Sequence, residues 1–163
     1  MRVRAFGAHR QPASRERTRG FTLIEILIVI ALIGMLAAIV IVAINPARQF
    51  ASARNAQRWS NVNTILNAVY QYAVDNSGTV PTAITTTSTE IWKTGSTGTS
   101  TALVDLSPLT QNEKYLTSMP VDPSCPTGCN TTGTGYFIFK SANGRITVNA
   151  TNTELSSTIS ATR

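Results

Sequence analysis

Few residues of this sequence have the type and spacing that catalysis needs. The only histidine, His9, lies among the six arginines of the first 20 residues. Catalysis by a Ser-His-Asp or Cys-His group and zinc binding by histidine both need an imidazole. A chain that loses these first residues has none, so the common hydrolase mechanisms are not expected.

The acidic residues beyond position 50 are spread over different segments. They are Asp75, Glu90, Asp105, Glu113, Asp122 and Glu154. Their spacing supports neither the carboxylate pair of a glycosidase nor the dense run of ligands in a calcium loop. The sequence also has no Gly-Lys-Ser/Thr phosphate loop. We expect solvated surface acids, no metal, no cofactor and no enzyme activity.

Cys125 and Cys129 are the two cysteines, separated by three residues. Thioredoxin-like redox sites have two intervening residues, and a zinc shell needs further ligands that the segment lacks. If the segment lies outside the cytoplasm, oxidation is permitted. We predict a structural disulfide between Cys125 and Cys129, which would restrict the unfolded chain by roughly 2 kcal/mol. Free thiols are the alternative.

The run from Phe21 to Ile44 has one charged residue, Glu25. It exceeds the roughly 18 to 20 apolar residues that cross a bilayer, and it is too long for a secretory signal. Most of the net charge of +6 precedes it, as six arginines and one glutamate. This asymmetry predicts a cytoplasmic N-terminus and residues 47–163 across the membrane. The rest of the chain is nearly neutral, so the basic pI predicts no nucleic-acid partner.

The junction Thr18-Arg19-Gly20-Phe21-Thr22-Leu23-Ile24-Glu25 closely resembles that of the type IV prepilin and type II secretion pseudopilin family. The resemblance implies removal of residues 1–20 as a leader by a prepilin peptidase, which cuts between Gly20 and Phe21. It also implies N-methylation of Phe21 and retention of the apolar run. Assembly ATPases and an inner-membrane platform protein are partners implied in the same way.

Glu25 is the residue of the apolar run with a predicted role. A charged carboxylate in the bilayer costs on the order of 2.5–3.5 kcal/mol on insertion scales, so it usually has a partner. Cleavage would create an ammonium at Phe21, about 6 Å away along a helix. Pairing of Phe21 with the Glu25 of an adjacent subunit would set the register between neighbours. In the alternative, Glu25 reaches the membrane surface without a partner.

A long helix is expected from Phe21 to Asn76. Apolar residues recur at three- and four-residue intervals, which marks one buried stripe: Phe50, Trp59, Val62, Ile65, Leu66, Val69, Tyr72 and Ala73. Polar residues mark the opposite face: Gln57, Arg58, Asn61, Asn63, Asn67 and Gln71. We predict helix kinks at Gly34 and Pro46, since Pro46 lacks a backbone donor. A simple membrane-exit turn at Pro46 is equally consistent.

The remainder is predicted to be a small head of the α+β class. Residues 77–105 form a Ser/Thr-rich loop, in which Ile91 and Trp92 could form a short strand. Residues 136–139 and 146–148 are β-rich runs on either side of a turn at 141–144. A small antiparallel sheet packed on the helix would bury both apolar faces. The predicted segments are a leader (1–20), a membrane or filament-core helix (21–46) and a head (47–163), with parts 47–76, 77–105 and 106–163.

From the resemblance we expect a structural subunit of a type IV pilus or a type II secretion pseudopilus. Copies of the chain would leave the lipid and polymerise into a helical filament, where Gly34, Ala37 and Ala38 permit close helix approach. The pattern from Leu106 to Pro123 is similar to major pseudopilins and slightly favours secretion. The alternative is a membrane-anchored binding module, such as an adhesin or a DNA-binding competence pseudopilin. Against DNA binding, the head's cations are dispersed in the sequence: Lys93, Lys114, Lys140, Arg145 and Arg163.

Overall fold

A computed structural model of the chain describes residues 20–93, 102–125 and 127–163. The leader, most of which lies in residues 1–19, therefore falls outside the described residues. The chain divides into two compact units, which meet between Ile44 and Asn45.

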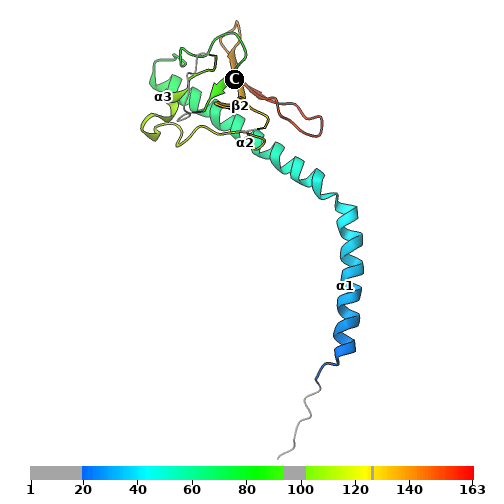
Figure 1. The fold of residues 1–163 in the computed structure, drawn as a ribbon. Coiled ribbons are helices and arrows are strands. Elements are labelled where there is room, and N and C mark those ends of the chain that lie inside the picture. The colour runs from blue at the N-terminus through cyan, green and yellow to red at the C-terminus, as the bar shows by residue number, and fades with distance from the viewer. Residues whose placement is uncertain (1–19, 94–101, 126) are drawn as a thin grey trace, which may run out of the picture. The chain divides into compact units, whose positions relative to one another are not determined.

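The first unit contains α1, which runs from Leu23 to Ile44 (Figure 1). Its 22 residues are long and apolar enough to cross a membrane, because at 1.5 Å per residue they span about 33 Å. None of its side chains is buried within the unit. The helix continues through Gly34, where an added Cβ would meet no atom within 4 Å. The helix is thus continuous at Gly34, and a bend there stays a prediction.

The helical run is broken at Asn45, the residue before Pro46, where the second kink is predicted. Asn45 adopts a left-handed conformation with φ 48° and ψ 79°, because the following proline disfavours the right-handed helical region for its neighbour. Its side-chain oxygen accepts a hydrogen bond from Arg48 N–H at 3.3 Å. Pro46 then occupies the first position of α2 (Pro46–Asp75), where its missing N–H costs nothing.

The second unit is an α+β head, as predicted. Its sheet consists of β1 (Thr89–Trp92), β2 (Gly133–Lys140), β3 (Ile146–Ala150) and β4 (Ile159–Thr162). The strands are antiparallel and lie in the order β1-β2-β3-β4. The predicted hairpin is β2–β3, in which Ile138 lies opposite Val148 and Gly144 takes a φ of 82° in the turn. The possible strand at Ile91 and Trp92 forms as part of β1.

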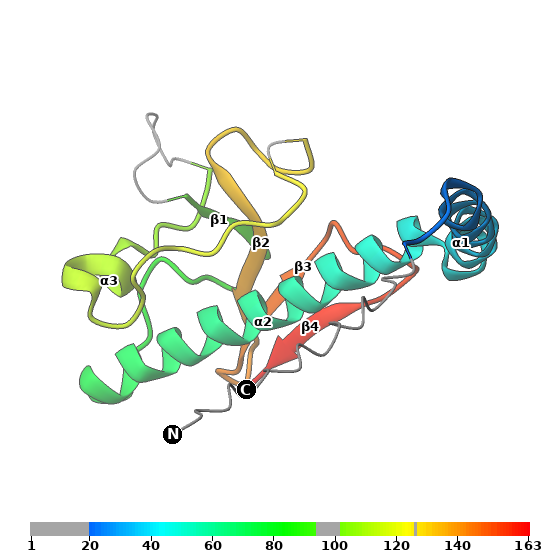
Figure 2. The same ribbon diagram turned by 90° about the horizontal axis from the view of Figure 1, so that it is seen from below.

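The core lies between the sheet and α2, which crosses β3 and β4 (Figure 2). Val62, Ile65 and Val69 of α2 are fully buried against side chains of the sheet such as Ile138 and Val148. The segment with α3 (Ser107–Thr110) and the short 3-10 helix η1 (Gln111–Glu113) adds further apolar side chains to this core. The helix ends as predicted, with Gly78 at φ 85° donating to the Ala73 carbonyl at 2.7 Å.

The prediction of which α2 residues form the buried stripe is wrong for the first half of the helix. Phe50 and Trp59 are 64% and 43% exposed, whereas Arg58 and Asn61, predicted to lie on the solvent face, are buried. The physical reason is the neighbouring structure: this part of α2 packs on polar loop residues that hydrogen-bond to it, rather than on the apolar face of the sheet. A polar stripe on the helix therefore becomes its buried side.

Candidate functional site

The first candidate site is the start of α1, where Thr22 and Glu25 cap the helix. Glu25 N–H donates to Thr22 Oγ1 at 3.2 Å, and Thr22 N–H donates to Glu25 Oε2 at 3.5 Å. This reciprocal pattern is a capping box, in which two otherwise unpaired amide groups find acceptors. Sequence reasoning missed the role of Thr22, although the Thr-x-x-Glu spacing is the signal for this cap.

The capping box fixes where the Glu25 carboxylate lies. One of its oxygens is bonded to the amide of Thr22, the residue that follows Phe21. Gly20 and Phe21 precede the helix and have no helical hydrogen bonds, and Phe21 is 80% exposed. The Gly20–Phe21 peptide bond is therefore outside the helix, and the Glu25 carboxylate accepts from the amide of the residue that follows Phe21, whose amine cleavage would create.

The region around this capping box matches a known protein-family model. Residues 15–43 match the model of the prokaryotic N-terminal methylation motif. The chain carries the hallmark motif of type IV pilins and pseudopilins. No curated protein and no solved structure matches the chain. The motif indicates a structural subunit, and together with the apolar α1 it fits a pilin-like protein that is anchored in a membrane.

The head of this pilin-like chain contains a buried polar cluster that the sequence did not reveal. Arg58 donates through Nε to Asp122 Oδ2 at 2.8 Å and through Nη2 to Ser124 Oγ at 2.6 Å. Through Nη1 it donates to Asn55 Oδ1 at 2.9 Å and to Glu154 Oε2 at 3.0 Å. We call these five residues the arginine cluster. It ties α2 to the loop that precedes β2 and to the loop between β3 and β4.

Arg54 extends the arginine cluster towards the solvent. It donates through Nε and Nη2 to the two carboxylate oxygens of Glu154, at 2.8 and 2.6 Å. These hydrogen bonds, followed by those from Arg58, lower the pKa of Glu154 to about 2. On the other side of the cluster, Asn61 donates to Tyr136 Oη at 2.8 Å. Burial raises the pKa of Tyr136 to about 12, so its hydroxyl stays protonated at neutral pH.

Cys125 and Cys129 are joined by a disulfide, with their Cα atoms 5.4 Å apart. The bridge packs on the backbone of Gly135, where φ is 79° and an added Cβ would lie 2.8 Å from Asp122 Cβ and 2.9 Å from Cys129 Sγ. Only glycine accepts both this conformation and this approach. The disulfide therefore belongs to the same packed region as the arginine cluster, and its surroundings are those of a structural bridge.

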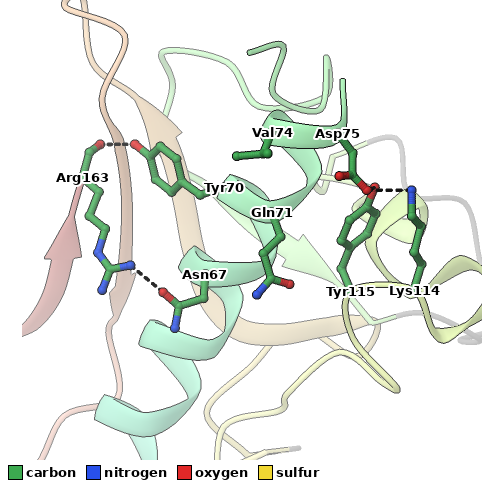
Figure 3. Close-up of a pocket in the computed structure, with 8 residues that line it drawn as sticks. All are labelled: Asn67, Tyr70, Gln71, Val74, Asp75, Lys114, Tyr115 and Arg163. Carbon is green, nitrogen blue, oxygen red and sulfur yellow. Dashed lines mark hydrogen bonds and ion pairs between the residues drawn. The ribbon is translucent and has the colours of Figure 1, made fainter. Parts of the chain in front are cut away.

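An open hollow lies over the last turns of α2 (Figure 3). Its volume is about 530 Å³, and it is lined by Asn67, Tyr70, Gln71, Val74, Asp75, Lys114, Tyr115 and Arg163. We call it the α2 hollow. On one side, Lys114 pairs with Asp75 at 2.8 Å and Tyr115 Oη donates to Asp75 at 2.9 Å. On the other side, Arg163 donates to Asn67 and accepts at its carbonyl from Tyr70.

The α2 hollow has the composition of a binding surface rather than of a catalytic one. Its two aromatic rings and its Gln71 amide, which has no hydrogen-bond partner among the described residues, offer stacking and hydrogen bonding, but its lining has no Ser, Cys or His nucleophile. The hydrogen bond from Lys114 lowers the pKa of Asp75, which keeps this carboxylate charged and unsuited to act as a general acid. Among the described residues, no group of three or more His, Cys, Asp or Glu side chains could hold a metal ion.

Three of the cations that are dispersed in the sequence meet at one end of the sheet. Lys140 lies opposite Ile146, which follows Arg145 and exchanges backbone hydrogen bonds with Arg163. The three residues are thus on adjacent strand ends, about 5 Å apart between neighbouring strands. In the described parts of the chain, none of the three forms an ion pair. These cations are dispersed in the sequence, but the sheet brings the backbone positions of three of them together.

Proposed function

We propose that this chain is a structural subunit of a type IV pilus or a type II secretion pseudopilus. It would be cut between Gly20 and Phe21, methylated at Phe21, and polymerised into a helical filament. One observation carries the proposal: residues 15–43 match the methylation motif, and Leu23–Ile44, which include most of that match, form an apolar helix with no buried side chain. Such a helix needs a cover, first of lipid and then of other copies of itself.

The proposed assembly moves α1 from lipid into a bundle of like helices. Lipid tails are as apolar as these side chains, so association depends on close packing and polar pairing rather than on the hydrophobic effect. Gly34, Ala37 and Ala38 offer the small side chains that close packing needs. The membrane lipid, the prepilin peptidase, the assembly platform and its ATPase are the partners that the motif implies.

Glu25 and Phe21 are the residues that we propose set the axial register between subunits of the filament. The capping box supports this role because it holds the Glu25 carboxylate at the end of α1 where the Phe21 amine would form. A methylated amine remains a cation, so it can pair with a carboxylate inside an environment of low dielectric constant. Pairing between neighbouring copies would fix how far one helix is shifted along the next. The uncut chain would lack this amine.

The proposed location is the cytoplasmic membrane, with the N-terminus inside and the head outside, and later an extracytoplasmic filament. The charge asymmetry about α1 supports this orientation. The disulfide in the head is consistent with it, since disulfides persist in oxidising compartments. A role in protein secretion is the finer proposal, and it rests on the similarity of residues 106–123 to major pseudopilins.

Mass spectrometry of the N-terminus tests the proposal directly. With a co-expressed prepilin peptidase, we expect a chain that begins at Phe21 and carries one added methyl group. Without the peptidase, the chain should keep its leader. Gly20→Ala should block cutting, whereas the matched Gly34→Ala should be processed normally. A chain that keeps its leader in the presence of the peptidase, or is cut beyond Ile44, would contradict the proposal.

The alternative function, a membrane-anchored binding module, is favoured by the three cations at the sheet end. A phosphate backbone bound by Lys140, Arg145 and Arg163 would give a slope of log K against log salt of roughly −2 to −3. Salt-titrated DNA binding by the full chain in detergent tests this. Lys140→Ala with Arg145→Ala should weaken binding, and Lys93→Ala is the control. No binding above that of the double variant would exclude the DNA-binding alternative.

A further inference from the structure

The outward side of α2 has no exposed charge over five turns. Between Arg54 and Asp75 the only charged residue is Arg58, which is fully buried in the arginine cluster. The exposed positions of this stretch carry amides, hydroxyls, small residues, Trp59 and Val74. A solvated helix face usually carries charged as well as polar residues, whereas depletion of charge together with an exposed aromatic is typical of the centre of a protein interface. This face therefore has the composition of a contact surface.

The same face carries both a protruding ring and a hollow. Trp59 is 43% exposed, and Asn63, Asn67 and Tyr70 follow it at intervals of four, four and three residues along one side of the helix. Asn67 and Tyr70 also line the α2 hollow. From Trp59 to Gln71, which lies at the middle of the hollow (Figure 3), the helix rises about 18 Å.

The chemistry of the α2 hollow suits an indole ring. Its volume of about 530 Å³ lies within the range of sites that enclose small ligands. The Tyr70 and Tyr115 rings can stack edge-to-face on another aromatic, and the cations of Arg163 and Lys114 can lie over its face. The Gln71 amide, which has no hydrogen-bond partner among the described residues, can accept from an indole N–H.

We propose that Trp59 of one copy of this chain docks in the α2 hollow of another copy. The contact is heterologous, because each copy offers a ring at one position and a hollow at another. Heterologous contacts that do not close into a ring produce open filaments. The inference rests on the proposed function in one respect: packing of α1 brings the heads to a high local concentration, at which a contact of one side chain suffices.

Photo-crosslinking of the full chain tests this contact. Trp59 is replaced by p-benzoylphenylalanine, which keeps a large aromatic side chain, and the chain is co-expressed with the prepilin peptidase and its assembly components. Equal amounts of ¹⁴N- and ¹⁵N-labelled chain distinguish links between copies from links within one copy. We expect mixed-isotope adducts that map to residues 67–75 or 114–115. The matched control is the same replacement at Gln57, an exposed residue that points about 160° away from Trp59.

A second variant fills the hollow instead of changing the ring. Gln71→Trp should lower the adduct yield from position 59 at least fivefold, and Gln57→Trp should leave it unchanged. Adducts that map elsewhere, or that occur equally from position 57, would overturn the contact. Sedimentation of filaments is scored in the same samples. Filaments without the mapped adduct overturn the contact alone, the adduct without filaments overturns only the polymer, and the absence of both overturns both.

Discussion

Arg58 and Asp122 form an ion pair at 2.8 Å in which both side chains are fully buried. The pair joins α2 to the loop that carries the disulfide. Arg58 also donates hydrogen bonds to Ser124 and Glu154. Removing one partner of a buried pair is costly because the other charge is left without compensation. The arginine cluster is therefore an attachment of the first half of α2, in addition to the apolar core that holds the second half.

Arg58→Met should destabilise the head by about 3–5 kcal/mol, since Asp122 would stay buried without a counter-ion. The measurement is urea unfolding followed by far-UV circular dichroism of the chain in detergent. Arg54→Met is the matched control: Arg54 is partly exposed, and such pairs contribute at most about 1 kcal/mol. Equal effects of the two variants would show that burial of the Arg58 pair is not what stabilises this attachment.

The stability of the head should fall in acid between about pH 4.5 and pH 2. The pKa of Glu154 is about 2 in the folded head and 4.5 as the reference for an unfolded chain. Its ionised form therefore stabilises the fold fully above pH 4.5, and this contribution is lost as the pH falls towards 2. Melting temperatures across this range should show the effect, and Glu154→Gln should reduce it. Glu113→Gln, at an exposed residue with no ion pair among the described residues, is the control variant.

Gly135→Ala should cost more than about 1 kcal/mol. Its φ of 79° disfavours any side chain, and its Cβ would overlap both Asp122 and Cys129. Gly144→Ala is the control that separates these causes: its φ is 82°, but the nearest atom to the added Cβ is Lys140 Cε at 3.9 Å. We expect thermal unfolding to show a larger loss at Gly135. A loss of the same size at both glycines would mean that the overlap with the disulfide region contributes nothing.

Thr22→Ala should reduce filament assembly, while Thr22→Ser should retain it. Loss of the hydroxyl removes the cap on Glu25 N–H, which is worth typically about 1 kcal/mol, and so weakens the first turn of α1 that positions the Glu25 carboxylate. Serine keeps the acceptor. Sedimented filament is the measurement, with processing at Phe21 checked in parallel by mass spectrometry. Normal assembly of processed Thr22→Ala would show that the capping box is not needed for the register between subunits.

The sequence predicted those features that depend on neighbouring residues. The apolar run of α1, the β2–β3 hairpin and the end of α2 at Gly78 all have local signals: composition, alternation and a turn glycine. The Thr22 cap has a local signal too, and it was overlooked. These parts of the fold and of the first site could be derived from the order of the residues.

The arginine cluster could not be derived in this way. Helical periodicity assigns polar residues such as Arg58 and Asn61 to the solvent face, and only the positions of distant loops reverse this. Asp122 and Glu154 are separated from Arg58 by 64 and 96 residues, so no spacing rule connects them. The α2 hollow is missed for the same reason, because Lys114 and Arg163 reach it from separate segments.

These separations set an order of events in folding. A contact that closes a long loop must wait for both ends of that loop, and the pair with Glu154 closes nearly the whole head. Until Glu154 has been synthesised, Arg58 has no complete set of partners, and the first half of α2 has no reason to dock. The head is therefore expected to fold only after its C-terminal strands are available, with the docking of α2 as a late step.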